Sequence, residues 1–308
     1  MNHLFGTDEI RGAAGAAPLD RPTLIRVGCA LARHLPEPNP RILIGRDTRS
    51  SGADLETWLH EGIRTGGGET VSAGVLTTPA IAILTRRFGF SAGVMISASH
   101  NPYPDNGVKV FSSNGNKSSD QLEAAIESEV LNSSADLRVD DTPPMAPDPN
   151  LRREYAAFLE STLSSSPNFA DLRIVLDCAN GAGYEVGPNL LTTLGLTVAS
   201  MGIKPDGRNI NQSCGSTHPE HMARRVVETN SDLGAALDGD GDRLILADHK
   251  GNIINGDAIL LMCARRLKRE NRLPGPGVVA TVMSNLALEK RLEAEGIRLC
   301  RTQVGDKY

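Results

Sequence analysis

One unit recurs three times along this chain of 308 residues, and it restricts the fold more than any other feature. Each copy reads as a short apolar strand, a turn, a helix that ends at a glycine, and a second strand. The copies start at residues 41, 173 and 277, and their helices end at Gly66, Gly195 and Gly296. Strands that alternate with helices form βαβ units, in which the paired strands run parallel. The sequence therefore predicts an α/β fold of tandem mixed, mainly parallel sheets flanked by helices.

Three copies of this unit predict three domains of similar design. Residues 132–150 are rich in serine, aspartate and proline, which is typical of a linker. Residues 248–256 read as a hairpin turn and a crossing, after which a helix over residues 257–268 opens the next domain. We therefore expect domain 1 over residues 1–148, domain 2 over residues 149–252 and an incomplete domain 3 over residues 253–308.

Composition excludes several classes of protein. With 40% apolar residues, 31 glycines and 4% aromatics, the chain suits turn-rich α/β layers. A net charge of −5 and a pI near 5.8 argue against nucleic acid as the main partner. The five cysteines are scattered and include no C-x-x-C pair, which fits reduced thiols. No signal-peptide pattern or apolar run of membrane-spanning length is present, so we expect a soluble, cytoplasmic protein, either monomer or homodimer, without a membrane partner.

The first chemically informative stretch joins two expected strands, over residues 94–96 and 108–111. Loops at the ends of strands are where open α/β sheets place their reactive groups. This stretch brings Ser99, His100 and Lys109 together. An ordinary surface loop is the alternative interpretation. A serine hydrolase is disfavoured, because adjacent side chains diverge and no G-x-S-x-G turn surrounds the serine.

The strongest chemical signal is the run of carboxylates at Asp238, Asp240 and Asp242, which are separated by glycines. Three carboxylates at this spacing repel one another unless a cation lies between them, and hard oxygen ligands suit Mg²⁺ or Ca²⁺. A calcium-binding EF-hand requires glycine and glutamate where this loop has Arg243 and His249. An acidic, solvated turn is the remaining alternative. The flanking residues are strand-like and would hold the loop firmly.

A magnesium site of this kind calls for a phosphate oxygen as well as carboxylates. The chain has no P-loop to hold a nucleotide, so the phosphate comes from the substrate or from the protein, and Ser99 is the candidate carrier. A phosphoserine brings a charge of about −1.5 to −2. Together with three aspartates and one divalent cation, the site would keep a negative charge of roughly −3. The natural compensating groups are Arg11, Lys109, His100 and Arg243.

A glycine pair at Gly181 and Gly183 follows an expected strand and invites comparison with dinucleotide-binding turns. That fingerprint requires a third glycine, but Gly187 comes one residue late. No acidic residue marks the end of a matching second strand. We interpret the pair as an ordinary turn between a strand and a helix.

Taken together, these segments resemble the α-D-phosphohexomutase family, and most closely its branch that acts on glucosamine phosphates. The resemblance covers the whole chain, and its most specific part is the serine loop combined with the metal loop. The matching motifs are FGTDEIRG (5–12), SASHNP (97–102), DNGVKVF (105–111), NIN (209–211), CGSTHPE (214–220), DGDGDR (238–243), TVMSN (281–285) and VGDKY (304–308). One departure is Glu9, where the family usually has glycine, and it adds a charge beside Arg11.

The resemblance implies an intramolecular phosphotransferase, an isomerase. Phosphorylated Ser99 would donate its phosphoryl group to a sugar monophosphate, and the resulting sugar 1,6-bisphosphate, which is also the activator, would turn over and return its other phosphate to Ser99. The family pattern makes Ser99 and the three aspartates of the metal loop the ligands of one Mg²⁺ per active site.

Further roles follow from the resemblance alone. Lys109 would be the proton-transfer residue; a lysine base requires a lowered pKa, which nearby Arg11 would favour and the phosphate would oppose. Arg11 and His100 would support the phosphate and the serine. The family pattern also assigns substrate or phosphate binding to Arg243, Thr217 and His218.

The family's sugar-recognition loop and fourth domain do not occur before residue 308, so we expect the chain to be the N-terminal part of such an enzyme. The first hypothesis is that the parent protein interconverts glucosamine-6-phosphate and glucosamine-1-phosphate for amino-sugar and peptidoglycan precursor synthesis. A phosphomannomutase or phosphoglucomutase is the alternative within the class. A catalytically silent, Mg²⁺-binding phosphoprotein fragment is the alternative outside it.

Overall fold

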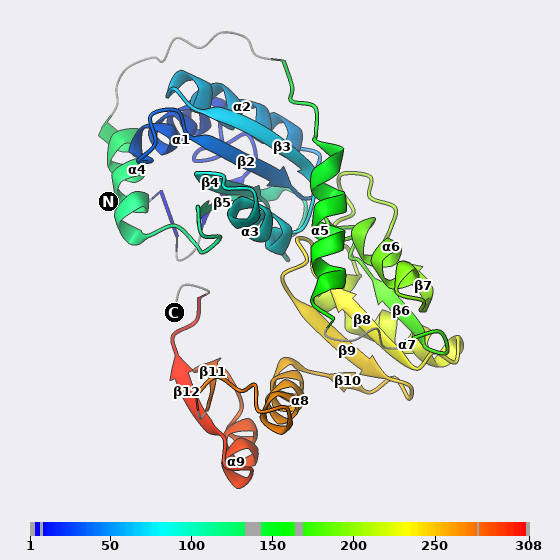
Figure 1. Ribbon diagram of the computed structural model, residues 1–308. Coiled ribbons are helices and arrows are strands. Elements are labelled where there is room, and N and C mark those ends of the chain that lie inside the picture. The colour runs from blue at the N-terminus through cyan, green and yellow to red at the C-terminus, as the bar shows by residue number, and fades with distance from the viewer. Residues whose placement is uncertain (1–3, 7–8, 133–142, 164–168, 276, 306–308) are drawn as a thin grey trace.

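The computed structural model describes residues 4–6, 9–132, 143–163, 169–275 and 277–305. The helices and strands of these residues group around three sheets that follow one another along the chain (Figure 1). We call the groups the first unit (residues 10–132), the second unit (residues 173–254) and the third unit (residues 256–302). The prediction of an α/β fold with mixed sheets flanked by helices is confirmed.

The first unit is a five-stranded sheet in the order β1-β5-β4-β2-β3. Strands β2, β3 and β4 are parallel, whereas β5 is antiparallel to β4 and β1 is antiparallel to β5. Helices α1, α2 and α4 cover one face, and α3 packs on the other. The bounds are β1 Ile10–Ala13, α1 Arg21–His34, β2 Arg41–Arg46, α2 Gly52–Thr65, β3 Glu69–Val75, α3 Thr78–Arg87, β4 Ala92–Ile96, β5 Asp105–Ser112 and α4 Asp120–Asn132.

Burial on both faces explains why the central strands are continuously apolar. Successive side chains of a strand point to opposite faces. In β2, Ile42 and Ile44 accordingly pack beneath α1 and α2, while Leu43 packs beneath α3. Helices α1 and α2 approach closely at Gly62, where an added Cβ atom would lie 2.1 Å from the Ile25 carbonyl oxygen. That contact requires glycine.

The second unit repeats the design with the strand order β10-β9-β8-β6-β7. Strands β6, β7 and β8 are parallel, and β9 and β10 add antiparallel strands at one edge. Helix α7 covers one face and α6 lies on the other. The bounds are β6 Arg173–Asp177, α6 Val186–Thr193, β7 Thr197–Met201, the 3₁₀-helix η1 Gly215–Thr217, α7 Pro219–Glu228, β8 Leu233–Leu237, β9 Leu244–Asp248 and β10 Ile253–Ile254.

The third unit is smaller, with two parallel strands and two helices packed around Ala264, Leu288, Leu292 and Ile297. Its bounds are α8 Gly256–Arg269, β11 Gly277–Thr281, α9 Leu286–Ala294 and β12 Arg298–Thr302. From β12 the chain runs back toward the first unit (Figure 1). None of the described helices is both long and apolar enough to cross a lipid bilayer.

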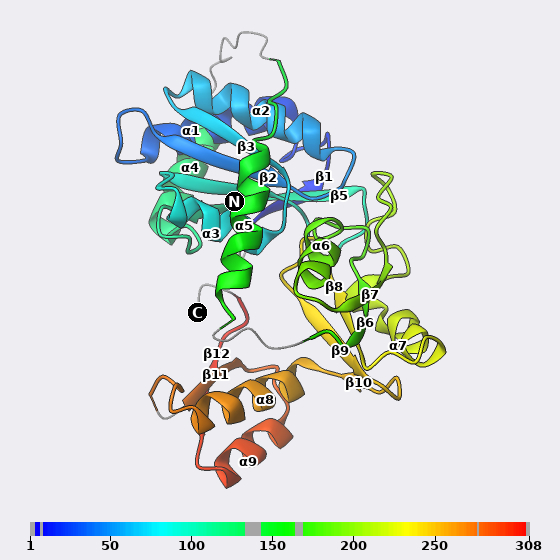
Figure 2. The same cartoon turned by 45° about the vertical axis from the view of Figure 1, so that its right-hand side comes forward.

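Helix α5 (Pro149–Ser161) was not predicted, and it connects the first two units. Figure 2 shows it lying beside both of them, and it contacts α3 and β3 on one side and α6 on the other. Its buried Tyr155 packs with the core under α3. Of the expected linker, residues 133–142 lie outside the described residues, and residues 143–148 contain no helix or strand. The proposed domain boundaries therefore stay a prediction.

Candidate active site

The candidate serine lies three residues after the end of β4, in a strained and buried turn. Ser99 has the left-handed φ of 51°, which non-glycine residues rarely adopt, and is only 2% exposed. Its backbone N–H donates to Ser97 Oγ at 2.9 Å, and the Ser97 hydroxyl in turn donates to Asp47 Oδ2 at 2.5 Å. The turn is therefore held by a chain of side-chain hydrogen bonds that starts at the end of β2.

Arg49, in the loop after β2, also holds the turn that carries Ser99. Its fully buried guanidinium forms an ion pair with Asp47 and donates from Nη2 to the carbonyl oxygens of Ser99, at 3.3 Å, and Asn101, at 2.6 Å. Burial raises the pKa of Asp47, although Arg49 acts to lower it. The sequence reasoning missed this pair. The available signal was that β2 and β4 are parallel neighbours, so the loops after them meet at one edge of the sheet.

The acidic loop, the turn between β8 and β9 that carries the three aspartates, belongs to the second unit but docks on the first. At the start of α3, the Thr78 backbone N–H donates to the Asp240 carbonyl oxygen at 2.9 Å, and the Thr78 hydroxyl donates to Asp240 Oδ2 at 2.6 Å. Negative charge is stabilised at a helix N-terminus, where backbone N–H groups are free. Gly239 makes the docking possible, because a Cβ atom there would lie 2.6 Å from the Ser99 carbonyl oxygen.

Docking brings the two motifs of the sequence into direct contact. The Ser99 hydroxyl donates to Asp238 Oδ2 at 2.5 Å. One carboxylate oxygen from each of Asp238, Asp240 and Asp242 lies within 4.8 Å of the others, and the first two residues are fully buried. Burial, reinforced by the two neighbouring carboxylates, raises the pKa of Asp238 to about 7. Burial also acts against charge on Asp240, but Lys109 outweighs it and lowers the pKa of that group.

This cluster fits a divalent cation. Asp240 Oδ1 is buried and has no hydrogen-bond partner among the described residues, although its other oxygen accepts from Thr78 and Lys109. A buried carboxylate oxygen is costly unless a cation or donor compensates it. Three aspartates that converge beside a serine hydroxyl form the hard oxygen donor set that Mg²⁺ or Ca²⁺ prefers. The loop could therefore bind a metal ion.

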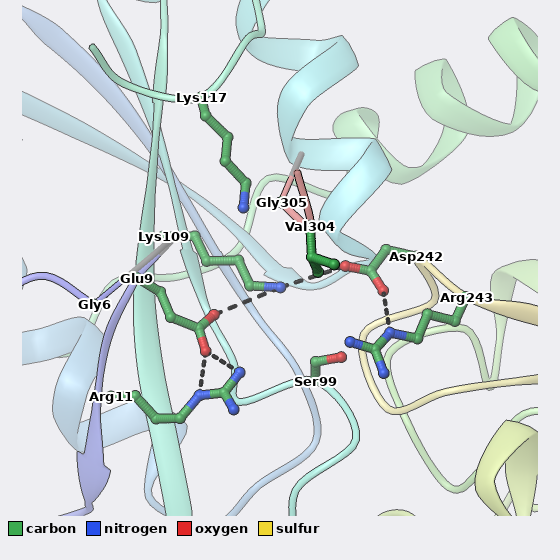
Figure 3. A pocket seen from close by; sticks show the side chains of 10 residues that line it. All are labelled: Gly6, Glu9, Arg11, Ser99, Lys109, Lys117, Asp242, Arg243, Val304 and Gly305. Atoms are coloured by element: carbon green, nitrogen blue, oxygen red, sulfur yellow. Dashed lines mark hydrogen bonds and ion pairs between the residues drawn. The ribbon is translucent and has the colours of Figure 1, made fainter. Parts of the chain in front are cut away.

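A pocket of about 600 Å³ opens above Ser99 (Figure 3). It is lined by Gly6, Glu9, Arg11, Ser99, Lys109, Lys117, Asp242, Arg243, Val304 and Gly305. Four of these side chains are cationic, which is the charge that suits a phosphorylated ligand. Lys117, which follows β5, extends into the pocket in Figure 3 and was missed by the sequence reasoning. Val304 and Gly305 reach the pocket from the segment after β12.

Lys109 has a different ionisation from the one the sequence predicted. Its Nζ atom lies 2.7 Å from Asp240 Oδ2 and 3.4 Å from Asp242 Oδ2. Burial by itself lowers the pKa of this ammonium, but the facing carboxylates outweigh burial and raise the pKa above its usual range; they are Asp240, Asp242 and Glu9. The expectation of a lowered pKa, brought about by Arg11, is therefore wrong for this arrangement. Instead, Lys109 is a firmly protonated donor.

The other predicted residues divide into two groups. Arg11 and Arg243 line the pocket, and the Arg243 backbone N–H donates to Asp238 Oδ1 at 3.1 Å. His100 lies beside the pocket with a buried Nδ1 atom that has no hydrogen-bond partner among the described residues, and burial followed by two arginines lowers its pKa. By contrast, Thr217 and His218 are exposed and are not among the residues that line this pocket.

Asn211 is a further residue that the sequence did not indicate. Its side-chain Nδ2 donates to the carbonyl oxygens of Ser99, at 2.9 Å, and Asn101, at 3.2 Å. The residue belongs to the second unit, so these bonds hold the serine turn of the first unit against the second. Its position within NIN, far from any strand, offered no signal for this contact.

Known proteins match the chain along its full length. Models of the phosphoglucomutase/phosphomannomutase α/β/α domains I, II and III match residues 2–136, 153–251 and 255–308, in that order. Phosphoglucosamine mutase of Granulibacter bethesdensis is 48% identical over 315 aligned residues, which cover 100% of this chain and 68% of that protein.

Solved structures share the fold at lower identity. A putative phosphomannomutase from Thermus thermophilus is 23% identical, with a TM-score of 0.83 over 98% of this chain and 69% of that one. The Aspergillus fumigatus N-acetylphosphoglucosamine mutase, solved in complex with GlcNAc-6P and magnesium, is 18% identical, with a TM-score of 0.54 over 98% of this chain and 63% of that one. At these identities the likeness establishes the fold alone.

Proposed function

The chain belongs to the phosphoglucomutase/phosphomannomutase family, the α-D-phosphohexomutases, and on this premise we propose that it carries the phosphoserine centre of a phosphoglucosamine mutase. Such an enzyme interconverts glucosamine-6-phosphate and glucosamine-1-phosphate through a sugar 1,6-bisphosphate. The observation that carries the proposal is the 2.5 Å hydrogen bond from Ser99 to Asp238, because it joins the phosphate carrier of one unit to the acidic loop of the next. The relative from G. bethesdensis, of which the chain spans 68%, bears the same name.

The reaction uses the pocket in two half-reactions. In one, an oxygen of the sugar monophosphate attacks the phosphorus of phosphorylated Ser99, the bond from phosphorus to Ser99 Oγ breaks, and the sugar becomes a 1,6-bisphosphate. In the other, Ser99 Oγ passes its proton to the facing Asp238 carboxylate and attacks the second phosphate of that sugar, and the sugar oxygen leaves; the first half-reaction returns that proton to Ser99 Oγ. Phosphoryl transfer depends mainly on alignment and on stabilising charge, and the buried serine turn supplies the alignment.

Asp238, Asp240 and Asp242 would hold one Mg²⁺, with Ser99 Oγ as a further ligand. When bound, the ion neutralises charge that develops on the transferring phosphoryl group. The orphaned Asp240 Oδ1 atom and the convergence of three carboxylates support this assignment. The A. fumigatus relative of similar fold was solved with magnesium.

Lys109 is proposed as the proton-transfer residue. Because three carboxylates keep its ammonium protonated, it is suited to give a proton to the sugar oxygen that loses its phosphoryl group. That transfer leaves Lys109 neutral, and in the opposite half-reaction the neutral amine takes the proton back from the sugar hydroxyl that attacks phosphorylated Ser99. Arg11 and Arg243 would bind phosphate oxygens, and the neutral imidazole of His100 would support the serine turn. Thr217 and His218 do not line this pocket, so they would bind a part of the sugar that extends beyond it.

The test is phosphorylation of Ser99 by defined donors. The 308-residue chain is incubated with Mg²⁺ and the 1,6-bisphosphate of glucosamine, glucose or mannose, and intact-mass analysis with peptide mapping follows the product. We expect one added phosphate, located on Ser99, with the fastest reaction from the glucosamine donor and none in Ser99→Ala. Faster reaction with the mannose or glucose donor would instead indicate a phosphomannomutase or phosphoglucomutase. No phosphate from any donor, with Mg²⁺ bound, would contradict the proposal.

A further inference from the structure

We propose that Glu9 is a positioning residue that holds Arg11 and Lys109 on the serine side of the pocket, an inference that rests on the proposed function. Its carboxylate lies between the two cations (Figure 3). Glu9 is only 6% exposed although it is charged, and it lines the pocket. It lies directly before β1 of the first unit, which carries both of its partners, whereas the aspartates belong to the second unit.

The pairing of β1 with β5 explains why these groups meet. Ile10 is opposite Val108 and Arg11 is opposite Gly107 in an antiparallel register, so Glu9 comes next to Lys109 just beyond the last pair. Directly opposite side chains in an antiparallel pair share a face, and side chains two residues apart along a strand also share it. Gly107 lets the strands pack closely there, because an added Cβ atom would lie 2.7 Å from the Ser97 carbonyl oxygen and 3.0 Å from the Ile10 carbonyl oxygen.

Each oxygen of the Glu9 carboxylate lies next to a different cation. Oε1 accepts from Arg11 Nε and forms an ion pair with the same guanidinium. Oε2 lies 3.7 Å from Lys109 Nζ and has no hydrogen-bond partner among the described residues. Glu9 and Lys109 are both buried, so removing one of them leaves an uncompensated charge, whereas the Arg11 side chain is 40% exposed and is held at its inner end by Glu9.

Glu9 differs from the other carboxylates that face Lys109. Asp240 and Asp242 belong to the acidic loop, whose charge a divalent cation would take up. Glu9 lies on the opposite side of Lys109 and is not part of that cluster. A carboxylate in a pocket for phosphate weakens ground-state binding of the anion through repulsion. An assisting role of Glu9 must therefore appear as a faster phosphoryl transfer to Ser99 and not as a higher affinity for the phosphorylated donor.

This difference defines the kinetic test. In Glu9→Gln, which keeps the shape and removes the charge, we expect the maximal rate of Ser99 phosphorylation by the 1,6-bisphosphate to fall on the order of 10-fold, while half-saturation stays equal or moves to lower donor concentration. Glu9→Asp, which keeps the charge on a shorter side chain, should recover part of the rate. The matched control is Glu37→Gln, an exposed glutamate far from the pocket, which should behave like the parent chain.

A second measurement does not require turnover. In ¹⁵N NMR of the full 308-residue chain, the Arg11 Nε–H signal is identified by its loss in Arg11→Lys. We expect slow solvent exchange in the parent chain and at least about 10-fold faster exchange in Glu9→Gln, because the ionic acceptor is lost.

An unchanged maximal rate together with unchanged Arg11 exchange in Glu9→Gln would overturn the inference. Tighter donor binding without any loss of rate would also overturn it, because Glu9 would then only lower the pocket's positive charge. If the parent chain takes no phosphate from any donor, the proposed function fails, and the exchange measurement alone decides the role of Glu9.

Discussion

The first and third units follow the same strand–helix–strand pattern but differ in how much of their apolar surface is buried. In the first unit, two apolar layers enclose the sheet, and β2 and β4 are buried on both faces. In the third unit, the described core is a small cluster around Leu288 and Leu292, while Met283 is 79% exposed. The pattern alone therefore does not decide how much core a unit has, because burial also requires layers on both faces of the sheet.

The units also contribute unequally to the candidate site. Its serine turn and acidic loop are joined by buried hydrogen bonds between the first and second units, at Thr78, Asn211 and Ser99. From the third unit's side, only the segment at Val304 and Gly305 lines the pocket among the described residues. Phosphorylation of Ser99 should therefore depend strongly on the interface of the first two units and weakly on the body of the third.

The largest expected effect follows from removing a proposed metal ligand at that interface. Asp240→Asn keeps the size of the side chain but loses the charge that faces the cation, and we expect Ser99 phosphorylation to slow by at least about 10²- to 10³-fold. Intact-mass time courses measure the rate, and calorimetry measures Mg²⁺ binding. The control is Asp171→Asn, an exposed aspartate outside the site. A parent-like rate in Asp240→Asn would show that the acidic loop does not take part.

Truncation of a core leucine in each unit tests whether the first and third units differ in stability as they differ in burial. Leu59 is fully buried in the first core, so Leu59→Ala should cost about 2–5 kcal/mol of unfolding free energy. Leu292→Ala should instead unfold the third unit locally and leave β2 and β4 protected. Urea titration and hydrogen exchange by mass spectrometry distinguish the two results. If Leu292→Ala exposes the first unit to exchange as well, the units unfold as one body and the contrast is lost.

Removal of the Asn211 side chain, which holds the serine turn of the first unit against the second unit, has an intermediate expected effect. Asn211→Ala removes the side-chain donor to two buried carbonyl oxygens, which we expect to cost about 1–3 kcal/mol and to slow Ser99 phosphorylation by roughly 10-fold. The neighbouring exposed Gln212 provides the control, Gln212→Ala. Parent-like phosphorylation in Asn211→Ala would mean that the contacts within the first unit, from Arg49 and Ser97, are enough to fix the serine turn.

The smallest predicted effect concerns the docking of the acidic loop on α3. Thr78→Val keeps the side-chain shape but removes the hydroxyl that donates to Asp240 Oδ2, so we expect the Kd for Mg²⁺ to rise about 10-fold. Calorimetric titration measures this change. Thr57→Val, in which the lost hydroxyl served only a carbonyl oxygen of α2, should leave the affinity unchanged. Equal affinities in both variants would remove Thr78 from the support of the cluster.

Local features of the fold were largely predictable because short-range chemistry decides them. Helix α1 begins where Asp20 caps it, with Asp20 Oδ1 accepting from the Thr23 backbone N–H at 2.9 Å, and it ends at His34 before a stretch with three prolines. The apolar runs of β2 and β4 were recognisable because both faces of those strands are covered. Helix α5 was missed, since its start falls in a proline-rich stretch that reads as a linker.

The sequence by itself determined the alternating α/β pattern and the two motifs of the candidate site, because residue type and spacing along the chain are enough to indicate a candidate phosphate carrier and a cluster of candidate metal ligands. Only the tertiary structure decided that Ser99 donates to Asp238, which is 139 residues away, and that Arg49, Thr78 and Asn211 hold the two loops. It also decided the protonation of Lys109. Electrostatic interactions depend on distance in space and on burial, and both are set by how the units pack.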